Sequence, residues 1–270
     1  MAAARRAAPA GAAHCIVVFA SRERVRALAR AAFPRRRTRL VLARSALDVA
    51  SAFRAELVDA ALVDLGAPGD EPWQAAALAR EFPSAPFFGV FPLRASDAPA
   101  LARCAGLDFA GVVLEGIDDA AVRDLVAPHA FTTRFGDALG EPPASLGLAS
   151  GLQRRTWRCL VAHTGRAVRT EALAEEVGVT REHLSRSFAE GGAPNLKRVI
   201  DLVRVLAAAE LAKNPGYDVR DVAAVLGFAS SSHLASTAQR VVGTRPTSLA
   251  RLRAVDLVER FAQGRSRSRR

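Results

Sequence analysis

The sequence is poor in the residues that form covalent or metal-mediated cross-links. Its 270 residues include 3 cysteines and 5 histidines. Cys15, Cys104 and Cys159 lie far apart, no Cys-x-x-Cys pair occurs, and the histidines are scattered. These features exclude a disulfide framework and a zinc site, and they are typical of the reducing cytoplasm. We expect a cytoplasmic protein that holds no metal and no cofactor, with its cysteines buried as small apolar residues.

Long apolar runs are also absent. A membrane-spanning helix needs about eighteen apolar residues in succession, and no such stretch occurs. The first residues, Met1 to His14, are rich in alanine and contain Arg5-Arg6, as targeting peptides do. The apolar run that follows them is short and has the character of a strand. We therefore expect neither membrane insertion nor export.

Catalytic motifs are missing as well. The sequence contains no Gly-x-Ser-x-Gly and no His-Glu-x-x-His. The glycine spacing of Gly66-Ala67-Pro68-Gly69 does not fit a dinucleotide-binding loop, and its proline removes an N–H group. Glu182 and His183 are adjacent, so on a helix their side chains point to different sides. We predict that the protein is not an enzyme and has no catalytic residues.

Positive charge is abundant, although lysine occurs only at Lys197 and Lys213. The formal net charge is +11. Residues 1–130 carry 16 arginines against 14 acidic residues, whereas residues 131–270 carry 22 basic residues against 13 acidic ones. The excess positive charge lies in the C-terminal half, where it favours binding to phosphates, although a basic surface also serves solubility.

Five short apolar runs alternate with five helical patterns in the N-terminal half. The runs are nearly continuous in apolar residues, as the strands of a parallel sheet covered on both faces must be. They comprise Cys15–Ala20, Arg39–Ala43, Ala60–Asp64, Pro86–Phe91 and Phe109–Leu114. The helical patterns comprise Ser21–Phe33, Ser45–Glu56, Trp73–Phe82, Ser96–Cys104 and Asp118–Pro128. This alternation predicts a doubly wound α/β domain with a five-stranded parallel sheet over residues 14–130.

The third run resembles strand three of a response-regulator receiver domain. It reads Val58-Asp59-Ala60-Ala61-Leu62-Val63-Asp64-Leu65-Gly66-Ala67-Pro68-Gly69. In receivers an Asp at the end of this strand accepts a phosphoryl group and a Pro-Gly follows. Asp64 holds that position. The resemblance implies a receiver-like fold and makes Asp64 the candidate phosphoacceptor.

The remaining residues of receiver chemistry are absent. Receivers carry an acidic pair after strand one, a Thr or Ser after strand four and a Lys after strand five. These positions here read Phe19-Ala20-Ser21, Phe91-Pro92 and Leu114-Glu115-Gly116. Asp64 alone cannot support transfer, because metal and cations must neutralise charge on the phosphoryl group. We predict a pseudo-receiver in which Asp64 caps the following loop; the alternative is a phosphorelay response regulator phosphorylated at Asp64.

Residues 131–149 are predicted to be a linker, because periodic apolar positions are few and turn-forming residues frequent. The turn formers are Gly136, Gly140, Pro142, Pro143 and Gly147. Helical spacing resumes over Leu152–Val161. This stretch is expected to begin an all-α domain over residues 150–256.

One pattern occurs twice between Thr170 and Leu249. Each copy contains a short helical stretch, a glycine that can adopt positive φ, an apolar residue and a second helical stretch. The two glycines are Gly178 and Gly227. Residues able to cap the helix starts are Thr170, Thr180, Asp218 and Ser230. The repeat predicts two helix-turn-helix units, each with a second helix able to enter a DNA major groove, rather than a bundle in which the repeat serves packing alone.

The two units resemble the DNA-binding domain of the AraC/XylS family of transcription regulators. The resemblance rests on Leu173-Ala174-x-x-Val177-Gly178, His183-Leu184-Ser185-Arg186-x-Phe188, Ala208-x-Glu210-Leu211, Val219-x-Asp221-Val222-Ala223-x-x-Leu226-Gly227-Phe228, His233-Leu234 and Gly243-x-x-Pro246. A long helix over about 195–214 would join the units, with an apolar stripe as their shared core. The resemblance implies a sequence-specific transcription regulator of double-stranded DNA. This interpretation allows two further partners. One is RNA polymerase, and the other is a second copy of the chain bound through the N-terminal domain.

The residues expected to face DNA lie on the second helix of each unit. In the first unit they are Arg181, Glu182, Ser185 and Arg186. Arg186 is the strongest candidate, because a guanidinium can bond guanine O6 and N7 together. In the second unit the candidates are Ser231, Ser232, His233, Ser236 and Arg240. Positions where the family commonly carries Arg, an aromatic residue and Lys are here Ser236, Ala238 and Gln239, so this unit is expected to contact the DNA backbone more than the bases.

Residues 262–270 are predicted to form a disordered basic tail that adds non-specific attraction to phosphates. A third function remains open at this point. If the second unit no longer engages DNA, the protein would be an adaptor that binds a protein partner.

Overall fold

The computed structural model of the chain describes residues 14–36, 38–188, 190 and 192–267. Its N-terminal half is a five-stranded, all-parallel sheet with the order β2-β1-β3-β4-β5. The strands are β1 (His14–Phe19), β2 (Thr38–Ala43), β3 (Ala60–Asp64), β4 (Phe87–Phe91) and β5 (Gly111–Leu114). This is the order of doubly wound domains of the flavodoxin and receiver type. The predicted fold class is therefore confirmed for this half.

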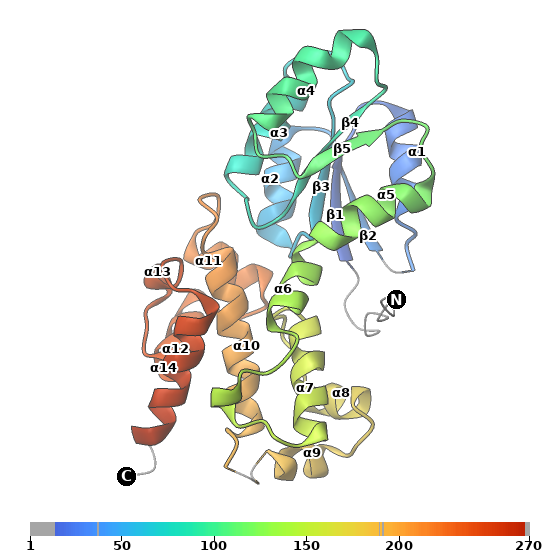
Figure 1. Cartoon of the computed structure of the whole chain (residues 1–270). Helices are drawn as coiled ribbons and strands as arrows, with labels where there is room; N and C mark the ends of the chain where they lie inside the picture. The colour runs from blue at the N-terminus through green and yellow to red at the C-terminus, as the bar shows by residue number, and fades with distance from the viewer. Residues whose placement is uncertain (1–13, 37, 189, 191, 268–270) are drawn as a thin grey trace.

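Helices cover both faces of the sheet, which is why its strands are apolar on both sides (Figure 1). They are α1 (Glu23–Ala32), α2 (Ala46–Ala55), α3 (Glu71–Ala77), α4 (Ala98–Ala105) and α5 (Asp119–Val126). One apolar core joins the sheet to α2, α3 and α4, and a second joins it to α1 and α5. All five predicted helices are present, although α3 begins two residues earlier than Trp73. Short 3-10 turns flank three of them: η1 (Leu78–Arg80), η2 (Ala95–Asp97) and η3 (Ala127–His129).

The segment predicted to be a linker contains a helix, α6 (Phe131–Leu139), followed by the 3-10 turn η4 (Ala144–Leu146). Phe131, Phe135 and Leu139 are buried in the core of the C-terminal half. Their spacing of four residues places them on one face of α6. The segment therefore contains a helix with a periodic apolar face, which the glycines and prolines around this short stripe obscured in the sequence.

The C-terminal half is all-α and contains the predicted long central helix, α10 (Leu196–Leu211). The other helices are α7 (Gly151–Ala162), α8 (Thr170–Glu176), α9 (Arg181–Ser187), α11 (Val219–Val225), α12 (Ser231–Val242), α13 (Pro246–Leu249) and α14 (Ala254–Arg267). α10 is buried on nearly every side rather than along one stripe. Helix α7, both helices of the second unit, α13 and α14 pack around it, and buried side chains of the first unit belong to the same apolar core. α10 therefore serves as the common core of the domain.

Helix α14 was not predicted from the sequence. This helix packs against α10 and α12 through the buried side chains of Leu257, Val258 and Phe261. It extends to Arg267, so most of the segment predicted as a disordered tail is helical. Residues 268–270 of that segment, and residues 1–13 at the other end, lie outside the described residues.

The two halves are joined by more than the chain connection. The loop between α10 and α11 lies against the N-terminal domain, and α11 packs on α2 (Figure 1). The Tyr217 hydroxyl donates to the carbonyl oxygen of Phe53 at 3.0 Å, and its ring meets that of Phe82 edge-on at 5.0 Å. The side-chain oxygen of Asn214 accepts from the backbone N–H of Ser84 at 2.8 Å. The N-terminal domain therefore contacts the second repeat unit directly.

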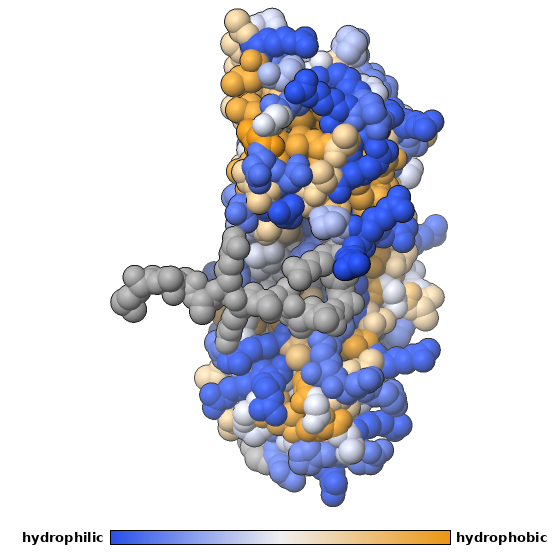
Figure 2. Space-filling view, turned by 90° about the vertical axis from the view of Figure 1, so that its right-hand side faces the viewer, coloured by the Kyte–Doolittle hydropathy of each residue, from blue (hydrophilic) through white to orange (hydrophobic). Residues whose placement is uncertain are grey.

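The outer surface shows an uneven distribution of hydropathy. Seen from the right of Figure 1, hydrophilic side chains cover much of the molecule, and a hydrophobic area lies on the upper half, over the N-terminal domain (Figure 2). Within the described ranges, no helix combines the length and apolar character needed to cross a bilayer.

Candidate nucleic-acid interface

The two repeat units are built alike at their turns. In the first, Gly178 has φ 76°, and the N–H groups of Gly178 and Val179 return to carbonyls of Glu175 and Ala174, each at 3.0 Å. In the second, Gly227 has φ 64°. The N–H groups of Gly227 and Phe228 likewise return to carbonyls three and five residues earlier, at 3.0 and 2.8 Å. These paired bonds end each first helix and turn the chain into the second. The predicted helix-turn-helix repeat is present in both copies.

Side-chain caps then start the second helix of each unit. Thr180 accepts from the N–H of His183 at 3.2 Å, and Ser230 accepts from the N–H of His233 at 3.0 Å. Asp218 caps α11 and forms a reciprocal capping box with Asp221. These three predicted caps are confirmed. Thr170 is not a cap: Arg169 holds the N-cap position of α8, and Thr170 is the first helical residue.

The predicted DNA-contacting residues of α9 all lie on the outside of the domain. Arg181, Glu182, Ser185 and Arg186 are exposed, whereas Leu184 is fully buried and anchors the helix. Arg181 forms an ion pair with Glu171 of α8, 3.0 Å apart. Within the described part of the chain, Arg186 has no such partner, so its guanidinium is free to meet a ligand.

The predicted residues of α12 are also accessible. Ser232, His233, Ser236 and Arg240 are exposed, and Ser231 is half-buried. The ring of His233 also packs edge-on against Phe228 at 5.6 Å, so this exposed residue contributes to the domain's packing. Ala238, where the family commonly carries an aromatic residue, is fully buried.

One buried arginine, which nothing in the sequence singled out, joins the turn of the second unit to the loop before the first. Arg204 of α10 donates to the carbonyl oxygens of Leu226 and Gly227, in the turn of the second unit, at 3.2 and 3.1 Å. Its Nε donates to Gly165, just before the first unit, at 3.4 Å. The guanidinium stacks on the ring of Phe228 at 3.7 Å, and burial lowers the pKa of Arg204. Arg204 lies in a stretch of apolar residues at helical spacing, and nothing in that stretch of sequence indicates this role.

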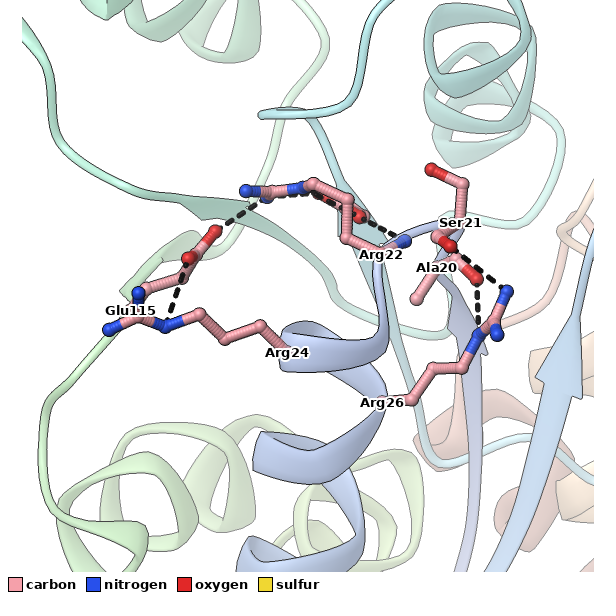
Figure 3. Close-up of polar contacts among 7 residues, drawn as sticks. Ala20, Ser21, Arg22, Arg24, Arg26 and Glu115 are labelled. Carbon is pink, nitrogen blue, oxygen red and sulfur yellow. Dashed lines mark hydrogen bonds and ion pairs between the residues drawn. The ribbon is translucent and has the colours of Figure 1, made fainter.

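The carboxyl edge of the parallel sheet is the second candidate site, and it is occupied by an ion-pair network. Asp64 at the end of β3 is fully buried, and Arg22 donates from Nε to its two carboxylate oxygens at 2.9 and 3.1 Å. The same guanidinium pairs with Glu115 after β5, at 2.5 Å. Figure 3 shows Arg22 reaching Glu115, with Arg24 on the other side of that carboxylate.

This network differs from the loop-capping role predicted for Asp64. Arg22 lies three residues after the end of β1, and Glu115 directly follows β5. Gly66 leaves room for the arginine, because a Cβ there would lie 2.5 Å from Arg22 Nη2. The carboxyl edge of the sheet is therefore filled by one guanidinium that lies between two carboxylates. Within the described residues, no group of three His, Cys, Asp or Glu side chains is arranged to hold a metal ion.

Comparisons with known proteins agree with the geometry of the C-terminal half. The family model described as "Helix-turn-helix domain" matches residues 173–251, which include both units. The comparison with curated proteins gives no match. Among solved structures, full-length FixJ from B. japonicum is 12% identical, with 69% of this chain and 94% of that chain covered and a TM-score of 0.38. The response regulator StyR is 16% identical, with 71% and 98% covered and a TM-score of 0.34. Residues 173–251 are therefore a DNA-binding helix-turn-helix domain of the AraC type, the kind of domain that transcription regulators carry.

Proposed function

We propose that the protein is a sequence-specific transcription regulator in which α9 and α12 enter two adjacent major grooves of DNA. The observation that carries the proposal is the duplication itself. Two units with the same turn geometry present exposed polar side chains on their second helices, and one buried helix, α10, joins them. Adjacent major grooves on one face of B-DNA are about 34 Å apart. A rigid connecting helix suits a fixed spacing of this kind.

The two reading helices would contribute differently. On α9, Arg186 would bond a guanine, and Glu182 at the helix start would accept from a cytosine amino group. On α12, the short side chains of Ser232 and Ser236 would contact phosphates or base edges at close range. The first unit would therefore supply most of the sequence discrimination, and the second most of the positioning.

The N-terminal domain would control DNA binding through its contact with α11 and the Tyr217 loop. Phosphoryl transfer to Asp64 is disfavoured as the signal, because Arg22 occupies both oxygens of that carboxylate. A second copy of the chain or RNA polymerase, bound to the N-terminal domain, would act on the second unit through the same junction. This mode of control fits a receiver-like domain that has kept the fold and lost the chemistry.

The proposal is tested by selecting target sites from random duplexes with the full-length protein and titrating the preferred duplex against a scrambled one. Wild-type protein should prefer the selected site by well over tenfold. Arg186→Ala should lose about 1–3 kcal/mol of binding free energy and relax the preference at one base pair. Arg30→Ala, which removes an exposed arginine from α1, should change neither quantity. Less than about tenfold discrimination by the wild-type protein would contradict sequence-specific reading.

A further inference from the structure

A depression lies between the two proposed reading helices. It has a volume of about 290 Å³ and is formed by side chains of α9, the start of α10 and the last turns of α12. The lining residues are Ser185, Asn195, Leu196, Lys197, Arg198 and Arg240. Ser185 of α9 and Arg240 of α12 border the same depression, so the two helices flank one continuous surface.

The depression carries a surplus of positive charge. Lys197 is exposed and has no ion pair within the described ranges of the chain. The guanidinium of Arg198 lies over the ring of Phe261 in α14, 5.1 Å from its centroid, which restrains its orientation. Arg240 forms an ion pair with the largely buried Asp201 at 3.0 Å. One acidic side chain therefore offsets three basic ones.

We propose that this depression binds the DNA phosphate backbone that lies between the two major grooves, with Lys197 and Arg198 as positioning residues. The inference rests on the proposed function, because it assumes that α9 and α12 engage one duplex. Two adjacent major grooves on one DNA face are separated by a minor groove bounded by phosphates. Basic side chains located between two groove-reading helices would meet those phosphates.

The two residues differ from the reading residues in what they determine. A contact to a phosphate carries no sequence information and fixes the register of the protein on the duplex. Lys197 and Arg198 would therefore increase affinity for every sequence alike. From the sequence, this stretch was predicted only as the start of a core helix, because its basic residues gave no indication of their position between the two units.

The test measures the salt dependence of binding by the full-length protein, with a selected duplex and a scrambled one. Each phosphate contact contributes about 0.9 to the slope of log K against log salt concentration. Lys197→Ala should lower the magnitude of that slope by about 0.9. The ratio of the wild-type binding constant to that of Lys197→Ala should therefore fall about 3.5-fold between 50 and 200 mM salt. The loss should be the same on both duplexes. Lys197→Arg, which keeps the charge, should restore the wild-type slope.

Lys213→Ala is the matched control. It removes the chain's other lysine, located just beyond the far end of α10 and paired with Glu210 at 2.6 Å. Its slope should equal that of the wild type. The inference is overturned if Lys197→Ala and Lys213→Ala have equal slopes while the wild-type protein still discriminates the selected duplex. A wild-type protein that does not discriminate would overturn the proposed function instead.

A second experiment locates the contact on the DNA. Single phosphates of the selected duplex are replaced by neutral methylphosphonates, one position at a time. Substitution of a phosphate between the two major grooves that α9 and α12 would enter should weaken binding by the wild-type protein. The same substitution should have little further effect on binding by Lys197→Ala. Sensitive phosphates found only outside that interval would contradict the assignment.

Discussion

The Tyr217 hydroxyl donates a hydrogen bond to the carbonyl oxygen of Phe53, 3.0 Å away, and so joins the loop before α11 to the end of α2. The ring of Tyr217 is largely buried against Phe82, and this burial raises the pKa of the hydroxyl. The phenol therefore stays neutral and able to donate at physiological pH. This contact links the receiver-like domain to the helix-turn-helix unit nearest to it.

Tyr217→Phe should lower the free energy of unfolding by about 0.5–1.5 kcal/mol, because one hydrogen bond is lost while the ring contact remains. Tyr217→Ala removes the ring as well and should have a larger effect. Urea unfolding followed by tryptophan fluorescence can use one reporter in each half, Trp73 and Trp157. We expect the unfolding transitions of the two halves to occur at different urea concentrations in Tyr217→Ala. Coincident transitions at the wild-type midpoint would show that the contact does not couple the two halves.

Arg22→Ala should destabilise the N-terminal domain by about 3–5 kcal/mol, because it leaves the buried carboxylate of Asp64 without its cation and Glu115 with only the more distant Arg24. Arg24→Ala is the control. This arginine also approaches Glu115, at 3.6 Å, but its side chain is 75% exposed, so the loss should be less than about 1 kcal/mol. Thermal unfolding of the two variants provides the comparison, and equal shifts would contradict the assigned role of Arg22.

The wild-type protein should gain no phosphoryl group when it is treated with acetyl phosphate and Mg²⁺. The reason is that Arg22 occupies the Asp64 carboxylate. Intact-mass spectrometry checks the result, with Asp64→Asn as the reference. Added phosphate in the wild-type protein but not in Asp64→Asn would instead support a phosphorelay response regulator.

Local features of the fold were predictable from the sequence, whereas long-range contacts were not. The five strands and the caps at Thr180 and Ser230 depend on neighbouring residues, and each was found within a few positions of its expected place. Helix α6 was missed because Gly136 lies within, and Pro142 just beyond, a stripe of only three aromatic and apolar residues. α14 was missed because no repeat or motif marked it.

In the candidate sites too, the position of a residue on its own helix was predictable, whereas contacts between distant residues were not. Helical periodicity placed Arg186 on the outer face of α9, and the structure has it exposed there. By contrast, the pairing of Arg22 with Asp64 joins residues 42 positions apart, and the contacts of Arg204 join α10 to two turns. Periodicity describes one helix or strand at a time, so it gives no information on such pairings.

Arg204→Leu should destabilise the C-terminal domain by about 1–3 kcal/mol, because it leaves carbonyl oxygens of the second turn without donors. Arg204→Lys retains the charge and should recover part of the loss. Circular dichroism during thermal unfolding measures both. We also expect Arg204→Leu to weaken DNA binding, since the same guanidinium fixes the turn of the second unit against the loop before the first. Wild-type stability of Arg204→Leu would contradict this account.

His14 should make stability depend on pH at the start of β1. Its contact with the buried carboxylate of Asp59 raises the pKa of His14 above the usual 6.5. A raised folded-state pKa means that the stabilisation is fully present below pH 6.5 and is lost as pH rises through the folded-state value. The difference in unfolding free energy between wild type and His14→Asn should therefore be larger at pH 6 than at pH 9. A difference that is constant over this range would contradict a charged contact.

Protection of a selected duplex from dimethyl sulfate tests paired groove reading most directly, because this reagent modifies guanine N7 in the major groove. The account predicts two protected segments on one face of the duplex, with centres about 10–10.5 base pairs apart. Arg186→Ala should remove protection from one segment, and the double variant Ser232→Ala, Ser236→Ala should weaken the other. A single protected segment, or two segments on opposite faces, would contradict it.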